Sequence, residues 1–116
     1  MLHEWHRIKR FIDKELPRGP GVVCVDLDSV LVYHTPDMGE GRLGRLLPFG
    51  LMLCQLLKQR EKTVIVLTAR SSGHVAIHAH LKAKGYPVEN VTNVKPPAQC
   101  YVDDKALRVS KNWGAA

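Results

Sequence analysis

The stretch that decides the fold is residues 22–28, which read Val-Val-Cys-Val-Asp-Leu-Asp. Its first four residues are apolar and mostly β-branched, which is typical of a strand buried on both faces, as in a parallel sheet. Asp26 and Asp28 follow at the point where this strand ends. The stretch therefore predicts a buried strand that presents carboxylates at one edge of a sheet.

Three further stretches continue this pattern along the chain. Residues 63–67 form a second apolar strand, which ends at Thr68-Ala69-Arg70. Residues 88–94 suggest a third, short strand. Residues 100–102 suggest a fourth, which ends at Asp103-Asp104.

Helices are expected before the first strand and between the strands. Apolar residues at helical spacing predict them over residues 2–16, 48–60 and 73–84, and Gly85 stands in a helix-stop position. Residues 33–47 contain one proline and three glycines and predict an irregular flap. Strands that alternate with helices indicate a parallel sheet with right-handed crossovers.

The composition suits one globular domain without disulfides. The chain has 116 residues, of which 45% are hydrophobic and 24% charged. Cys24, Cys54 and Cys100 lie in apolar stretches without a C-x-x-C pair, so we expect reduced core thiols in a cytoplasmic protein. No signal peptide is evident and no apolar stretch is long enough to cross a bilayer, so we expect no membrane association.

The formal net charge of +6 favours anionic ligands such as phosphate esters, nucleotides or nucleic acid. The basic residues are dispersed, apart from His-Arg-Ile-Lys-Arg at residues 6–10. A solvated basic surface is therefore an equally good interpretation of the charge.

Polar side chains should converge at one edge of the expected sheet, because ligands bind beyond the carboxyl ends of parallel strands. The polar residues that follow the first, second and fourth strands are Asp26, Asp28, Thr68, Arg70, Asp103 and Asp104. Four carboxylates at one edge repel each other unless a cation binds among them, and Mg²⁺ prefers such oxygen ligands. A bound Mg²⁺ would neutralise a phosphate and let an aspartate attack phosphorus.

These stretches resemble the four motifs of the haloacid dehalogenase superfamily. Residues 22–31 resemble the first motif, an apolar strand followed by D-x-D, and residues 64–70 the second, a strand that ends in Thr or Ser. Residues 101–104 are similar to the fourth motif, a strand that ends in paired acids. Lys95 fits the order and spacing of the third motif. A lone D-x-D is a weak signal, but four motifs in the correct order are a strong one.

The resemblance implies a fold and a domain organisation. We expect an α/β protein with a three-layer, Rossmann-like parallel sheet and helices on both faces. A single domain would span residues 1–116, with an N-terminal helix over 1–17 and a catalytic core over 22–109. No stretch is long enough for a cap domain, so the site should be open to large substrates.

The resemblance also implies roles for individual residues. Asp26 would be the nucleophile, and Asp28 the general acid and base. The Mg²⁺ ligands would be Asp26, Asp28, Asp103 and Asp104, with Asp103 favoured over Asp104. Thr68 and Lys95 would bind the transferring phosphoryl group, with Arg70 as a further substrate contact. Lys82, Lys84 and Lys105 remain alternatives to Lys95.

Simpler interpretations exist for each of these residues. Taken alone, Asp26 and Asp28 are better explained as capping acids in a turn, and Thr68 could cap a helix. His74 and His78 are spaced as zinc ligands on one helical face, but without a third ligand a polar surface stripe is favoured. Family members mostly have Gly-Thr after the second aspartate, whereas this chain has Ser29-Val30, so we expect a turn that bends less freely.

Together these patterns predict a Mg²⁺-dependent phosphomonoester hydrolase that acts through an aspartyl-phosphate. Its substrate would be a phosphorylated small molecule, a nucleotide or a nucleic-acid end. The alternative is a non-catalytic module of the same fold that binds nucleic acid or a protein partner. A dehalogenase is disfavoured because it would not need the acids after the fourth strand.

Overall fold

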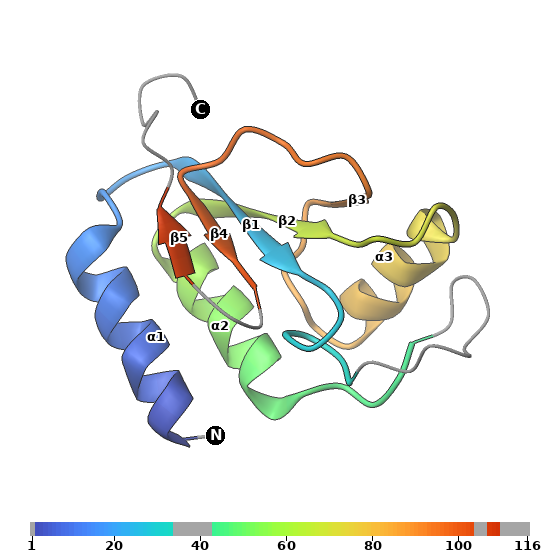
Figure 1. Cartoon of the computed structure of the whole chain (residues 1–116), viewed down its shortest axis with the longest axis horizontal. Helices are drawn as coiled ribbons and strands as arrows, with labels where there is room; N and C mark the ends of the chain where they lie inside the picture. The colour runs from blue at the N-terminus through green and yellow to red at the C-terminus, as the bar shows by residue number, and fades with distance from the viewer. Residues whose placement is uncertain (1, 34–42, 104–106, 110–116) are drawn as a thin grey trace.

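The computed structural model describes residues 2–33, 43–103 and 107–109, with side chains over 6–33 and 43–103. Its helices are α1 (Leu2–Glu15), α2 (Pro48–Gln59) and α3 (His74–Ala83). Its strands are β1 (Gly21–Asp26), β2 (Lys62–Leu67), β3 (Asn90–Thr92), β4 (Cys100–Val102) and β5 (Leu107–Val109). The strands form one sheet with the order β3-β2-β1-β4-β5 (Figure 1).

Strand β1 is the centre of the sheet. It pairs in parallel with β2 and β4, and β2 pairs in parallel with β3. Strand β5 pairs antiparallel with β4 at the edge. The strand order reverses at β1, which makes its carboxyl end a topological switch point. The predicted α/β class with a Rossmann-like parallel sheet is confirmed.

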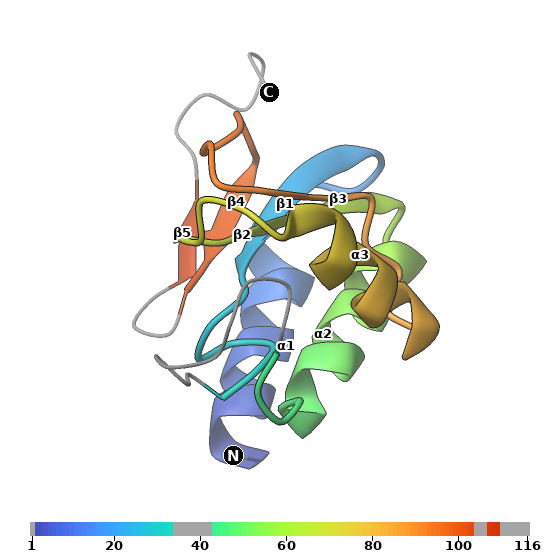
Figure 2. The ribbon, with the colours of Figure 1, turned by 90° about the vertical axis from the view of Figure 1, so that its right-hand side faces the viewer.

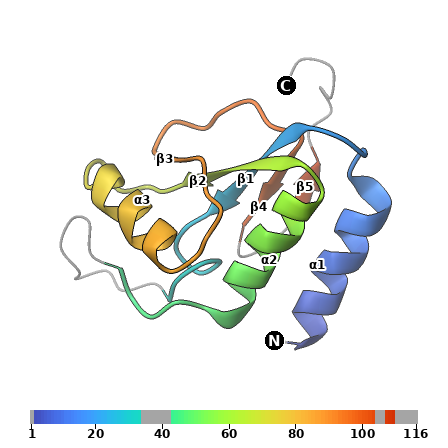
Figure 3. The same ribbon diagram turned by 180° about the vertical axis from the view of Figure 1, so that it is seen from behind.

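The three described helices lie on the same face of the sheet (Figures 2 and 3). The burial of side chains along β2 agrees with one covered face. Val64 and Val66 are buried, whereas Ile65 and Leu67, which point to the other face, are half-buried. The opposite face is crossed by residues 93–99, which contain no helix. This segment includes two consecutive prolines, which disfavour a helix. The second helical layer that we expected is thus replaced, over the described residues, by an extended connection.

The hydrophobic core lies between the sheet and the helices. Apolar side chains from all three helices meet the inner face of the strands there: Ile8, Ile12, Leu16, Leu53, Leu57, Ile77 and Leu81 against Val23, Val25, Val64, Val66 and Val102. Burying each such side chain contributes about 1.5–3 kcal/mol. The helical spacing of the sequence identified most of this core, because that spacing is imposed by the face each helix buries.

The three cysteines are free and buried, as predicted. Burial raises the pKa of Cys54 and of Cys100 to about 12. Burial, together with the nearby Asp26 carboxylate, raises the pKa of Cys24 to about 11. All three thiols therefore stay protonated at neutral pH and behave as small apolar side chains.

Two elements differ from the sequence predictions. The third strand is limited to Asn90–Thr92 instead of the predicted 88–94, and β5 was not predicted. Both are strands of three residues, too short to show a periodic pattern of their own. None of the helices in the described parts of the chain has the length and apolarity that membrane spanning requires.

Lys62, at the start of β2, forms hydrogen bonds with two other segments, the α1–β1 loop and residues 93–99. Its side chain is only 2% exposed. The Nζ group donates hydrogen bonds to the Pro17 and Gly19 carbonyls, both at 2.6 Å, and to Gln99 Oε1 at 3.0 Å. Gly21 is needed beside it, since a Cβ there would lie 2.1 Å from the Gln99 side chain. Lys62 thus holds both the α1–β1 loop and the 93–99 segment against the sheet.

The turn after β1 adopts the conformation for which glycine is best suited. Ser29 has a φ of 70° in this turn, which is the left-handed region. The Ser29 N–H donates to the Val32 carbonyl at 2.7 Å, so the turn is closed by a backbone hydrogen bond. The chain therefore makes a tight turn of the kind that glycine adopts without strain, but with a serine that strains it.

Replacing Ser29 with glycine should stabilise the protein by about 0.5–1 kcal/mol, because relief of the left-handed strain exceeds the extra entropy of an unfolded glycine. Urea unfolding of the variant measures this gain. Ser71→Gly is the matched control, because Ser71 is also exposed but has no positive φ. An equal effect of both substitutions would show that strain at Ser29 is not the cause.

Candidate active site

The carboxyl end of β1 continues into a turn that fixes the direction of two aspartates. Asp26 is the last residue of the strand. The Leu27 N–H donates to the Leu67 carbonyl at 2.9 Å, which extends the pairing with β2 by one residue. The chain then folds back, and the Leu31 N–H donates to the Leu27 carbonyl at 2.9 Å. Asp28 is therefore held in a short turn at the switch point of the sheet.

Two adjoining cavities open at this edge. The larger has a volume of about 310 Å³ and is lined by Asp26, Asp28, Leu67, Thr68, Ala69, Asn93 and Lys95. The smaller has a volume of about 90 Å³ and is lined by Cys24, Asp26, Leu67, Lys95, Tyr101, Val102 and Asp103. Asp26 and Lys95 border both of them. The predicted residues from four separate segments thus meet around one pair of cavities.

Thr68 is held by the turn that follows β2. Its side chain is buried, its N–H donates to the Thr92 carbonyl at 2.9 Å, and its Oγ1 accepts from the Arg70 N–H at 3.1 Å. It does not cap a helix, because α3 begins at His74 and the N-cap residue is Gly73. The Thr68 hydroxyl keeps its own proton, which it can donate to an oxygen in the cavity.

Lys95 is positioned by an aromatic ring on β4. Its Nζ lies 4.3 Å from the centroid of the Tyr101 ring, within the range of a cation–π interaction. The Tyr101 hydroxyl donates to the Pro96 carbonyl at 2.5 Å. Tyr101 therefore holds the backbone next to Lys95 as well as its ammonium group.

The geometry distinguishes Lys95 from two of its alternatives. Lys82 lines a separate cavity with Tyr86 and Glu89. Lys84 is the C-cap of α3. Neither lines the cavities that contain Asp26, and Lys105 lies outside the described residues.

Arg70 does not line the larger cavity itself but forms an ion pair with Asp28, which does. Its Nη2 lies 3.4 Å from Asp28 Oδ1, and both side chains are mostly buried. The Arg70 carbonyl accepts a hydrogen bond from His74 Nε2 at 2.7 Å, which fastens the loop to α3. His78 instead donates to the Val88 carbonyl at 2.8 Å. The two histidines considered as zinc ligands thus bind different backbone carbonyls.

The carboxylates offer donors that fit Mg²⁺ without forming a complete cage. Asp26 shares the larger cavity with Asp28 and the smaller one with Asp103. No three carboxylate, imidazole or thiol groups among the described residues are grouped closely enough to hold an ion. Asp104 lies outside the described residues. Mg²⁺ is often bound through one or two carboxylates, several waters and a substrate phosphate, and this donor set suits that mode.

Two residues of the site were not identified from the sequence. Asn93 follows β3 as Thr68 follows β2, so the strand-end rule points to it once β3 is located. Tyr101 lies inside β4, and no local sequence pattern indicates that its ring faces Lys95. That contact depends on the path of the 93–99 segment across the sheet.

Comparison with known proteins supports the fold alone. No protein-family model and no curated protein matches the chain. A solved structure described as "Structure of the conserved protein coded by locus from Bacteroides thetaiotaomicron" is similar, with a TM-score of 0.58 and 20% identity. The match covers 84% of this chain and 86% of that chain. The chain is therefore an α/β protein with a Rossmann-like sheet and a polar site at its switch point.

Proposed function

We propose that this protein is a Mg²⁺-dependent phosphomonoester hydrolase of the haloacid dehalogenase type. The observation that carries the proposal is the shared cavity of Asp26, Asp28, Thr68 and Lys95 at the switch point. It combines a nucleophilic carboxylate, a second carboxylate and two phosphate-binding side chains. These are the groups that a phosphoryl transfer through an aspartyl-phosphate requires.

The reaction has two steps in this proposal. An oxygen of Asp26 attacks phosphorus, and the bond between phosphorus and the leaving oxygen breaks as Asp28 gives that oxygen a proton. Asp28 then takes a proton from a water molecule, which attacks the aspartyl-phosphate and releases inorganic phosphate. Arg70 pairs with Asp28 and orients its carboxylate for both steps.

The remaining side chains bind the phosphoryl oxygens. The Thr68 hydroxyl and the Lys95 ammonium donate to them, and Asn93, which also lines the cavity, adds an amide donor. Mg²⁺ held by Asp26, with Asp28 or Asp103, would neutralise phosphate charge and so let an anionic nucleophile approach. The positive charge of the chain and the open edge favour a nucleotide or a nucleic-acid end as substrate.

A substrate panel with and without Mg²⁺ tests the proposal. Purified protein should hydrolyse an aryl phosphate with Mg²⁺ and lose this activity when the ion is chelated. A mononucleotide and a 3′-phosphorylated oligonucleotide should be turned over faster than a sugar phosphate. Salt-sensitive binding of the oligonucleotide without turnover of any substrate would instead indicate the non-catalytic binding module.

Replacing Tyr101 with leucine should raise the KM for an aryl phosphate about two- to fivefold, because a cation–π contact at an exposed site contributes roughly 0.5–1 kcal/mol. Tyr101→Phe is the matched variant, since it keeps the ring beneath Lys95 but loses the hydrogen bond to Pro96. It should show a smaller rise in KM. If both variants bound substrate equally badly, the ring would not be what positions Lys95.

A further inference from the structure

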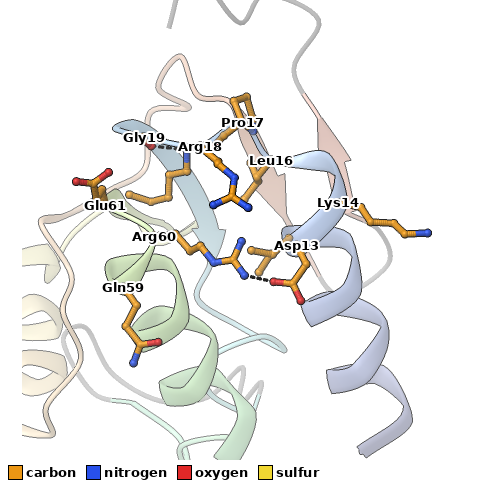
Figure 4. A pocket seen from close by; sticks show the side chains of 11 residues that line it. Asp13, Lys14, Leu16, Pro17, Arg18, Gly19, Gln59, Arg60 and Glu61 are labelled. Atoms are coloured by element: carbon orange, nitrogen blue, oxygen red, sulfur yellow. Dashed lines mark hydrogen bonds and ion pairs between the residues drawn. The ribbon is translucent and has the colours of Figure 1, made fainter.

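A second hollow lies at the opposite edge of the sheet, where β1 and β2 begin (Figure 4). It has a volume of about 310 Å³ and lies between the end of α1, the α1–β1 loop and the end of α2. Its polar lining includes Asp13, Arg18, Arg60 and Lys62. Its size is at the lower end of that of small-molecule pockets.

Two guanidinium groups from different segments turn toward the middle of this hollow. They belong to Arg18 in the α1–β1 loop and Arg60 at the end of α2, whereas Lys14 and Glu61 point away (Figure 4). Asp13 forms ion pairs with Arg60 and, at 3.4 Å, with Lys9. One carboxylate is thus shared between two cations, and Arg18 has no acidic partner within the described part of the chain.

Several carbonyl groups around the hollow already accept hydrogen bonds. A helix end would normally repel an anion, because its last carbonyls are partly negative. Here the Lys62 ammonium donates to the Pro17 and Gly19 carbonyls, and the backbone N–H of Arg60 donates to carbonyls in the last turn of α2. These hydrogen bonds reduce the number of open acceptors that compete with an anion for the two guanidinium groups.

We propose that this hollow binds the phosphate group of a small anionic molecule through Arg18 and Arg60. Planar guanidinium groups match phosphate oxygens with paired hydrogen bonds. Arg60 exchanges its contact with Asp13 for the ligand, so Asp13 competes with the anion. The cations on the exposed side of α1, which include Arg7 and Arg10, add to the field that attracts it.

Calorimetric titration of the full chain with orthophosphate in EDTA tests this site, and it needs neither Mg²⁺ nor turnover. Arg18→Ala should weaken binding about tenfold, as expected for loss of a charged hydrogen bond. Asp13→Asn should strengthen binding, because it removes the competing carboxylate. Lys14→Ala is the matched control: it removes the same charge as Arg18→Ala, from a side chain that points away, and should have little effect. Urea unfolding checks that each variant is folded.

Two further measurements identify the ligand and the residues that bind it. Adenosine 5′-monophosphate that binds more tightly than orthophosphate would indicate a nucleotide, and equal affinities would indicate phosphate itself. Adenosine alone should not bind. Amide NMR shifts should change at Arg18, Gly19 and Arg60. Equal effects of Arg18→Ala and Lys14→Ala, shifts confined to Thr68 and Asn93, or no binding of either phosphate probe would overturn the proposal.

Discussion

Replacing Asp26 with asparagine should reduce the proposed phosphatase activity by a factor of about 10⁴ or more, as expected when the group proposed as the nucleophile is removed. An amide has the shape of a carboxylate but is a poor nucleophile, so the aspartyl-phosphate cannot form. Asp26 also borders both cavities of the site, and no other described carboxylate does so. Initial rates on an aryl phosphate with saturating Mg²⁺ measure the loss.

The matched control is Glu15→Gln, which removes one carboxylate charge from the exposed end of α1. Its rate should equal that of the unchanged protein. Urea unfolding should show that Asp26→Asn is folded, because Asp26 is only partly buried at the end of its strand. Turnover that persists in the folded variant would mean that a different group attacks phosphorus.

Replacing Lys62 with methionine should lower the free energy of unfolding by about 3 kcal/mol, since one buried and two part-buried acceptors lose their donor, and an unpaired buried acceptor costs about 1–3 kcal/mol. The substitution keeps most of the side-chain length, so the loss is mainly one of hydrogen bonding. The acceptors affected are the Pro17 and Gly19 carbonyls and Gln99 Oε1. Urea unfolding followed by circular dichroism measures the change.

Lys58→Met is the control for that substitution, because Lys58 lies on the exposed side of α2. It should change stability by less than about 0.5 kcal/mol. If Lys62→Met cost no more than this control, water would be replacing the ammonium group, and the three segments would not depend on it.

Much of the sheet and the site could be predicted from local patterns. Strands β1 and β2 are continuous apolar runs, and the polar residues directly behind them are conspicuous because a parallel sheet brings those ends to one edge. Asp26, Asp28, Thr68 and Lys95 meet at that edge in the structure. The α/β class followed from the alternation of strands and helices, which leaves few topologies open.

The rest depends on contacts between distant segments. A lysine such as Lys62 is normally exposed, and only the fold shows the carbonyls that bury it. Pro96 and Pro97 disfavour a helix between β3 and β4, whereas the three-layer fold that the resemblance implies would place one there. The pairing of Arg60 with Asp13 and of Arg70 with Asp28 joins residues that no local spacing relates.

The helix-free segment 93–99 has a consequence for thermal inactivation. It carries Asn93 and Lys95 into the site at one end and ends in Gln99 beside Lys62 at the other. A strap of this kind has few apolar anchors and opens locally at a lower cost than the core. Opening it removes two of the proposed phosphate-binding side chains while the helices stay packed on the sheet. On warming, enzymatic activity should therefore be lost at a lower temperature than the helical circular dichroism signal.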